Sequence, residues 1–221
     1  MKKLVAVLLF FASHAAPAEI PPSAQEYIEW CDIWISHANE TNLPRVLLIG
    51  DSITRDYYPD VEKHLEGKAY VARLATSRFA SDPVLLQEIA LVLDNTKFDI
   101  IHFNNGMHGW QHSEEEYRAA FPKMIETIRT HAPAAKLVWA ATTPLKVSNS
   151  SNLKEASDER IAARNEIGLQ CIKGQNIAVD DLNALMRGHP EYHSDNVHFN
   201  GDGIRLEAAQ VAASIEPLLK H

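Results

Sequence analysis

The chain reads Val46-Leu47-Leu48-Ile49-Gly50-Asp51-Ser52-Ile53-Thr54 near the end of its first quarter, and this stretch decides the predicted fold. Four branched apolar residues in a row are typical of a strand buried on both faces, as in a parallel sheet covered by helices. Gly50 lets the chain turn sharply where the apolar run ends. Ser52 is then expected at the amino end of a helix, where unpaired N–H groups and the helix dipole favour negative charge.

Such a turn has two interpretations. A strand, a glycine and a capping residue occur together in many α/β proteins because they make a good turn. The serine is alternatively a nucleophile, since open α/β sheets bind ligands at the carboxyl ends of their strands. The G-x-S-x-G motif is absent, because Thr54 stands two residues after Ser52. Whether Ser52 is a nucleophile therefore depends on whether the rest of the chain supplies a base for it.

Four more short apolar runs follow, separated by segments with helical periodicity, at residues 69–75, 98–103, 137–141 and 177–179. Strands that alternate with helices predict an α/β fold with three layers, α/β/α, around a parallel five-stranded sheet with right-handed crossovers. Before these strands, Tyr27, Trp30, Cys31 and Trp34 recur at helical spacing. This spacing predicts a first helix that packs its aromatic stripe on the domain.

The amino terminus has the three parts of a secretory signal peptide. Lys2 and Lys3 precede an apolar run at residues 4–11, and small residues end at Ala18. We expect residues 1–18 to be a signal peptide that is too short to span a bilayer, with a buried helix or a retained anchor as the alternative. Residues 19–221 are enough for a single domain, secreted or periplasmic, with no stable membrane insertion after cleavage.

The net charge bears on which partners the protein is expected to bind, and the cysteine content bears on its disulfides. The formal net charge at pH 7 is −8 with neutral histidines, and loss of Lys2 and Lys3 would make it more acidic. This balance works against nucleic acid as a partner. Two cysteines, Cys31 and Cys171, could form one disulfide in an oxidising compartment, although the sequence does not assign it.

A base for the serine is available near the end of the chain. Histidine is the usual proton acceptor for serine near neutral pH, and it needs an acceptor of its own to fix its tautomer. Asp195 and His198 lie three residues apart before the last helical segment. One turn could present both side chains to Ser52, with His198 as base and Asp195 as its orienting partner.

Gly50-Asp51-Ser52 after the first strand, together with Asp195-x-x-His198 before the last helix, resembles the GDSL-like, or SGNH, hydrolase family. The resemblance covers nearly the whole chain after residue 18. It implies a flavodoxin-like fold and a serine ester hydrolase, in which Ser52 is the nucleophile, His198 the general base and Asp195 the residue that orients it.

The resemblance also implies an oxyanion hole made of the nucleophile's own N–H, a glycine N–H after the second strand and an asparagine side chain after the third. Two of these parts differ in this sequence. Arg78 or Ser77 stands where the glycine belongs, and Gly106-Met107-His108-Gly109 falls on the third block. His108 then replaces the asparagine, and its neutral imidazole could donate one hydrogen bond with a pH dependence, while Asn105 is the competing donor.

A metal site is the main alternative for the histidines. His108 and His112 are four residues apart, as are His189 and His193, a spacing that on helices could hold zinc with Asp195. A glycine and a proline inside these pairs favour loops instead. We therefore expect no metal and no other cofactor.

These features together predict a secreted serine esterase that removes short acyl groups, acetyl foremost, from carbohydrate or small esters. Trp110 and Tyr192 are expected to line the cleft for substrate binding, because aromatic rings stack on sugars. An O-acetyltransferase with the same triad is one alternative. The other is a catalytically weak carbohydrate-binding module on the same fold.

Overall fold

A computed structural model describes residues 25–146 and 156–219. The predicted signal peptide at residues 1–18 lies outside the described residues. The described strands are β1 (Cys31–Ile35), β2 (Arg45–Gly50), β3 (Tyr70–Thr76), β4 (Ile100–Phe103), β5 (Lys136–Ala140) and β6 (Ile177–Asp180). The described α-helices are α1 (Ser52–His64), α2 (Pro83–Asn95), α3 (Glu114–His131), α4 (Asp158–Ile172), α5 (Leu182–Arg187) and α6 (Gly201–Leu219).

The strands form one sheet in the order β1-β3-β2-β4-β5-β6. Strands β2 to β6 run parallel to their neighbours, and β1 alone is antiparallel. The five parallel strands thus have the flavodoxin-like order, with β2 in the middle of the sheet. The predicted three-layer α/β/α fold is confirmed, and the sheet has one strand more than predicted.

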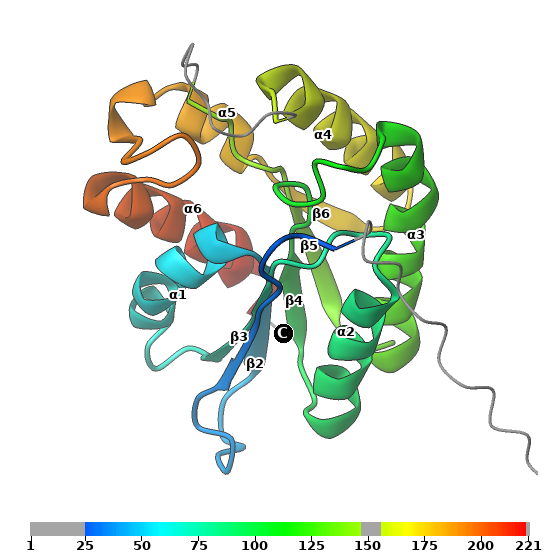
Figure 1. The fold of residues 1–221 in the computed structure, drawn as a ribbon. Coiled ribbons are helices and arrows are strands. Elements are labelled where there is room, and N and C mark those ends of the chain that lie inside the picture. Colours follow the sequence, from blue (N-terminus) through cyan, green and yellow to red (C-terminus); the bar gives the residue numbers. More distant parts are fainter. Residues whose placement is uncertain (1–24, 147–155, 220–221) are drawn as a thin grey trace, which may run out of the picture.

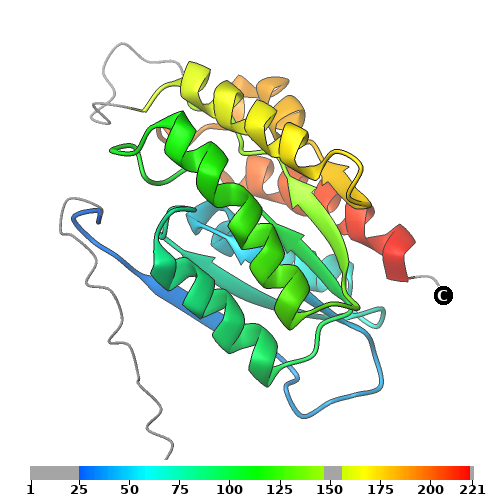
Figure 2. The same ribbon diagram turned by 90° about the vertical axis from the view of Figure 1, so that its right-hand side faces the viewer.

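Alternation along the strands divides the core into two layers. In β2, Leu47 and Ile49 belong to one apolar cluster, whereas Val46 and Leu48 belong to the other, as expected when successive side chains point to opposite faces. Helices α2, α3 and α4 cover the first face, and α1, α5 and α6 cover the second (Figures 1 and 2). All six residues of β2 are buried, as its continuous apolar run predicts.

The helix predicted from Tyr27, Trp30, Cys31 and Trp34 is wrong. Residues 31–35 form the edge strand β1, which pairs with β3 from Cys31 opposite Thr76 onward. The aromatic spacing was no sign of a buried stripe, since Tyr27 is fully exposed and Trp34 is 55% exposed. Branched and aromatic residues at positions 33–35 suit a half-covered edge strand, and the open edge of β3 supplies a partner that local periodicity does not reveal.

Both cysteines are free thiols, with Cys31 in β1 and Cys171 in α4. Among residues 25–146 and 156–219, no helix is long and apolar enough to cross a membrane.

Candidate active site

Ser52 is the first residue of α1, directly after the end of the central strand β2. Asp51 caps the helix by accepting a hydrogen bond from the N–H of Ile53 at 2.9 Å. Glycine is required at position 50, because a Cβ there would lie 2.0 Å from the hydroxyl oxygen of Thr54. Since helix N–H groups at the first turn have no earlier carbonyl to bind, the N–H of Ser52 is available to a ligand.

His198 and Asp195 lie in a tight loop between the turn Pro190–Tyr192 and α6. His193 forms a bridge with Phe199, and the N–H of Ser194 donates to the carbonyl of His198 at 2.9 Å. The loop thereby folds back on itself and holds His198 and Asp195 side by side.

The structure joins the three predicted residues in one hydrogen-bonded chain. The Ser52 Oγ lies 2.8 Å from the Nε2 of His198, and the Nδ1 of His198 lies 2.9 Å from the Oδ2 of Asp195. Because an ionised carboxylate only accepts, His198 donates its Nδ1–H to Asp195. Its Nε2 then carries the lone pair and accepts the hydroxyl proton of Ser52. This is the protonation state that a general base needs.

Asp195 stays ionised over the whole useful pH range. Partial burial raises the pKa of its carboxyl, but the N–H groups of His198 and Val197 and the side chain of His198 lower it to about 2. Both N–H groups donate to Oδ1 at 2.7 Å. Loss of activity at mildly acidic pH therefore has to come from protonation of another group.

The loop after β3 offers one backbone donor. The N–H of Ser77 is engaged by the carbonyl of Trp30 at 3.1 Å. The N–H of Arg78 has only a long contact of 3.3 Å, to the hydroxyl oxygen of Thr76. Of the two predicted candidates, Arg78 is therefore the one whose N–H a substrate oxygen could capture.

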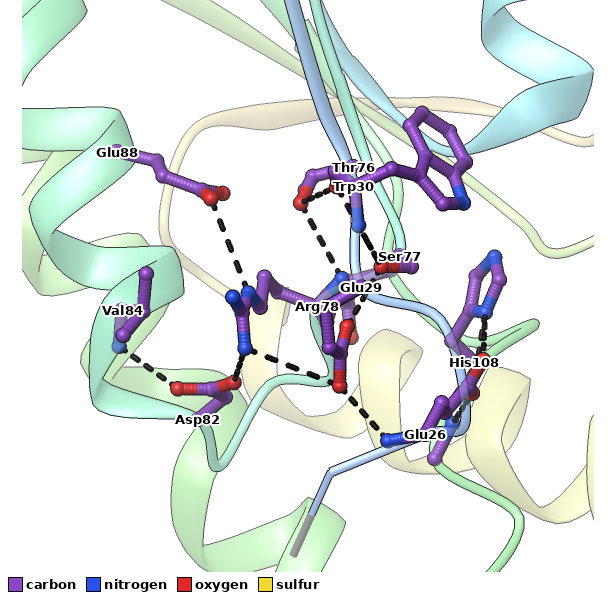
Figure 3. A network of polar contacts seen from close by, with 12 residues as sticks. Glu26, Glu29, Trp30, Thr76, Ser77, Arg78, Asp82, Val84, Glu88 and His108 are labelled. Atoms are coloured by element: carbon purple, nitrogen blue, oxygen red, sulfur yellow. Dashed lines mark hydrogen bonds and ion pairs between the residues drawn. The ribbon is translucent and has the colours of Figure 1, made fainter. Parts of the chain in front are cut away.

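The bulky side chain of Arg78 has its own partners. Its guanidinium lies 2.9 Å from the carboxylate of Asp82, 3.8 Å from that of Glu29 and 3.9 Å from that of Glu88. Figure 3 shows the guanidinium held among these three carboxylates. The positive charge of Arg78 is thus neutralised by Asp82 and Glu88 at α2 and by Glu29 before β1.

Asn105 and His108 both lie in the loop after β4, but their side chains have different partners. The amide Nδ2 of Asn105 donates to the carbonyl of Arg78 at 2.8 Å, so Asn105 ties the two loops together. His108 instead has its Nδ1 beside the carboxylate of Glu26, and its Nε2 is buried without a hydrogen-bond partner among the described residues. The Nε2 of His108 is thus a ring nitrogen that a ligand could contact, and the choice between His108 and Asn105 as the third donor stays a prediction.

Arg164 of α4 fixes the position of this loop. Its side chain is fully buried, and its guanidinium donates to the carbonyls of Gly106 at 2.8 Å, His108 at 2.7 Å and Gly109 at 3.1 Å. Burial, together with the nearby Arg160, lowers the pKa of Arg164 to about 10, so it remains a cation at neutral pH. One buried cation thus sets the backbone that carries His108.

The sequence pattern of the GDSL-like lipase/acylhydrolase family matches residues 48–206, which span both Ser52 and His198. The chain belongs to the GDSL-like lipase/acylhydrolase family. No curated protein is significantly similar to it in sequence.

Solved structures share the fold of this GDSL-like chain at low identity. A carbohydrate esterase of family 3 from Talaromyces cellulolyticus is 19% identical, with a TM-score of 0.64 over 80% of this chain and 98% of that one. The acetyl xylan esterase AlAXEase is 18% identical, with a TM-score of 0.61 over 77% and 99%. The catalytic domain of peptidoglycan O-acetyltransferase A from Streptococcus pneumoniae is 15% identical, with a TM-score of 0.57 over 80% and 94%.

Two histidines of the pairs considered for zinc, His112 and His189, have individual partners in this GDSL-like protein. His112 lies beside Glu116 and stacks on Phe79, whereas His189 lies beside Glu191 and stacks on Tyr192. Within residues 25–146 and 156–219, no three or more His, Cys, Asp or Glu side chains are grouped so as to hold a metal ion.

The two aromatic residues predicted to bind substrate are engaged by neighbours. Trp110 has the guanidinium of Arg164 4.5 Å from its ring centre and that of Arg160 at 5.5 Å. Tyr192 stacks on His189 with ring centres 5.0 Å apart. Their role in substrate binding stays a prediction.

Another aromatic residue, Trp30, lies beside His108. Its ring centre lies 6.3 Å from that of His108, and the guanidinium of Arg55 lies 5.0 Å from the Trp30 ring. Arg55 is three residues after Ser52 on α1. Sequence reasoning placed Trp30 in a core stripe and missed it, because nothing in the local pattern shows which distant loop it meets.

Proposed function

We propose that this GDSL-like acylhydrolase is a serine esterase that removes short acyl groups, acetyl foremost, from carbohydrate or small esters. The observation that carries the proposal is the continuous chain from the Ser52 hydroxyl through His198 to Asp195 at the carboxyl edge of the sheet. A serine without a catalytic role is not expected to have its hydroxyl hydrogen-bonded to a histidine that is itself oriented by a carboxylate.

In the proposed reaction, the Ser52 Oγ attacks the ester carbonyl carbon while its proton passes to the Nε2 of His198. The resulting oxyanion is held by the N–H groups of Ser52 and Arg78 and by His108. The bond to the alcohol oxygen then breaks as His198 returns the proton to that oxygen. Water attacks the acyl-serine by the same route, which releases the carboxylic acid and restores Ser52.

The preference for a short acyl group on a sugar is drawn from the neighbours of Ser52. The Trp30 ring and the Arg55 guanidinium, 5.0 Å apart, offer a face for stacking and hydrogen-bond donors, which suit a sugar better than an alkyl chain. Two of the proteins with the same fold are named as a carbohydrate esterase and an acetyl xylan esterase. Export of the protein, which residues 1–18 predict, is part of the same proposal.

The test is a comparison of acyl chain length. We expect kcat/KM to fall by about 10-fold or more from p-nitrophenyl acetate to the octanoate, because longer chains would lie against charged groups. We also expect acetylated xylo-oligosaccharides to release free acetate. Faster turnover of the octanoate than of the acetate would contradict the short-acyl proposal.

An O-acetyltransferase is the second candidate, since the chain shares its fold with a peptidoglycan O-acetyltransferase domain. Loss of acetyl donor only when an acceptor sugar is present, without free acetate, would favour it. Sugar binding without any turnover would instead favour the binding module.

A further inference from the structure

We propose that Glu26 is a positioning residue for His108, which accepts the Nδ1–H of the imidazole so that Nε2 can donate to the oxyanion only while His108 is protonated. The proposal rests on acyl transfer at Ser52, and it adds a requirement to it. One histidine of the site, His198, must be neutral, and another, His108, must be charged.

The first support is that the carboxylate of Glu26 contacts two adjacent residues, His108 and Gly109. Its two carboxylate oxygens lie 3.1 and 3.0 Å from the Nδ1 of His108, and Oε1 also accepts the N–H of Gly109 at 2.9 Å. The carboxylate can only accept, so the Nδ1 of His108 must carry a hydrogen. Neutral His108 therefore has a lone pair on Nε2, and only the imidazolium has an Nε2–H to donate.

The second support is the environment of Nε2. This atom is buried and has no hydrogen-bond partner among the described residues. Buried polar atoms without partners are rare in folded proteins, and a substrate oxygen would satisfy this one. Figure 3 shows that the imidazole edge opposite Glu26 points to the side of the Trp30 ring. That ring borders Arg55 on α1, the helix that begins at Ser52.

The third support is that Glu26 is itself fixed to the other donor loop. Its N–H donates to the carboxylate of Glu29 at 2.8 Å, and the second oxygen of Glu29 accepts the hydroxyl of Ser77 at 2.6 Å. Arg78 follows Ser77, and its guanidinium lies 3.8 Å from Glu29. Residues 26–30 thus connect the loop of Arg78 to the loop of His108, as Figure 3 shows.

The charges around His108 favour its protonated form. Burial lowers the pKa of His108, but the hydrogen bond to Glu26 and the charges of Asp51, Glu26 and Glu29 outweigh it, so the pKa lies above its ordinary value. Glu26 shifts in the matching direction, since the contacts with His108 lower its carboxyl pKa against the effect of burial.

The cations nearby act on other atoms. Arg164 binds the backbone carbonyl of His108, and Arg55 lies across the Trp30 ring. Because the pKa of His108 is raised, the Nε2–H donor is present below that pKa and is lost as the pH rises through it. As a general base, His198 acts only through an unprotonated Nε2. The structure thus predicts a bell-shaped dependence of kcat on pH.

The experiment records kcat against pH with p-nitrophenyl acetate for the wild type, Glu26→Gln, His108→Asn and the double variant. Glutamine can still accept from His108 but carries no charge. We expect Glu26→Gln to move the alkaline limb to lower pH, with kcat about 10-fold below wild type at the alkaline end and the acid limb in place. His108→Asn supplies an amide that needs no proton, so its alkaline limb should be absent, and the double variant should match His108→Asn.

Two further variants separate positioning from a merely structural role. Glu26→Asp keeps the charge and should retain the alkaline limb even if its kcat is lower. Asp94→Asn is the matched control, because Asp94 holds His131 at 2.6 Å on the surface and should leave the pH profile unchanged. An unmoved alkaline limb in Glu26→Gln, or an equal loss of activity at every pH, would overturn the proposal.

An NMR titration of His108 keeps the test independent of turnover. We expect the imidazole to deprotonate at lower pH in Glu26→Gln than in the wild type, and an unchanged titration would refute the proposal whatever the activity. Failure of acyl transfer itself has a different signature, which is equal turnover by the wild type and Ser52→Ala.

Discussion

Replacing Ser52 by alanine is expected to reduce kcat for p-nitrophenyl acetate by about 10⁴- to 10⁶-fold, as when a nucleophile is removed from a unit that acts together. In the proposed mechanism the hydroxyl oxygen of Ser52 attacks the ester, and its partner, the Nε2 of His198, lies 2.8 Å away. Without it, the N–H groups and His108 can only polarise the ester towards water. Steady-state rates on purified protein measure this loss directly.

The fold of the Ser52→Ala variant should be intact. Asp51, and not Ser52, provides the side-chain cap of α1, so the helix keeps its start. Ser214→Ala is the matched control, because within residues 25–146 and 156–219 the Ser214 hydroxyl donates only to a carbonyl of its own helix, that of Val211. This control should turn over like the wild type. A Ser52→Ala protein with wild-type activity would show that the nucleophile lies elsewhere.

Replacing Arg164 by leucine is expected to cost about 3–9 kcal/mol of unfolding free energy and to remove most of the activity. The substitution leaves the buried carbonyls of Gly106, His108 and Gly109 without their donor, at about 1–3 kcal/mol for each unsatisfied group. The loop that carries His108 also loses its anchor. Urea unfolding and kcat, measured on the same preparation, check both parts.

Arg187→Leu is the control for this substitution. Arg187 is an exposed arginine of α5 that pairs with Asp158 at 2.6 Å, and surface pairs are worth less than about 1 kcal/mol. Arg164→Lys should lie between the two, because one ammonium group keeps the charge but cannot match the forked guanidinium. Equal stability of Arg164→Leu and Arg187→Leu would contradict the anchoring role of Arg164.

The sequence predicted the parts of this molecule that have a local signature. Strands β2, β4 and β5 are mostly apolar runs that are buried along nearly their whole length, and such a strand needs no knowledge of its partners to be found. Ser52, Asp195 and His198 were found because each follows a strand or precedes a helix in the right order. The structure then brings these three side chains together by hydrogen bonds.

The residues that sequence reasoning missed depend on contacts between distant segments. Glu26 meets His108 82 residues further along the chain, and Arg164 binds the carbonyl of His108 from 56 residues away. No spacing rule connects a glutamate in a lead-in segment to a loop after β4. The strand β1 was mistaken for a helix for the same reason, since its partner β3 lies about 40 residues later.

The catalytic role of Ser52 is tested most directly by covalent trapping with a small alkyl fluorophosphonate. The serine oxygen forms a bond to phosphorus, fluoride leaves, and the hydroxyl proton passes to His198. Intact-mass and peptide analysis should find one adduct per chain, on Ser52, with activity lost in proportion, and no adduct on Ser52→Ala. An adduct on another residue, or inactivation without any adduct at Ser52, would contradict the account.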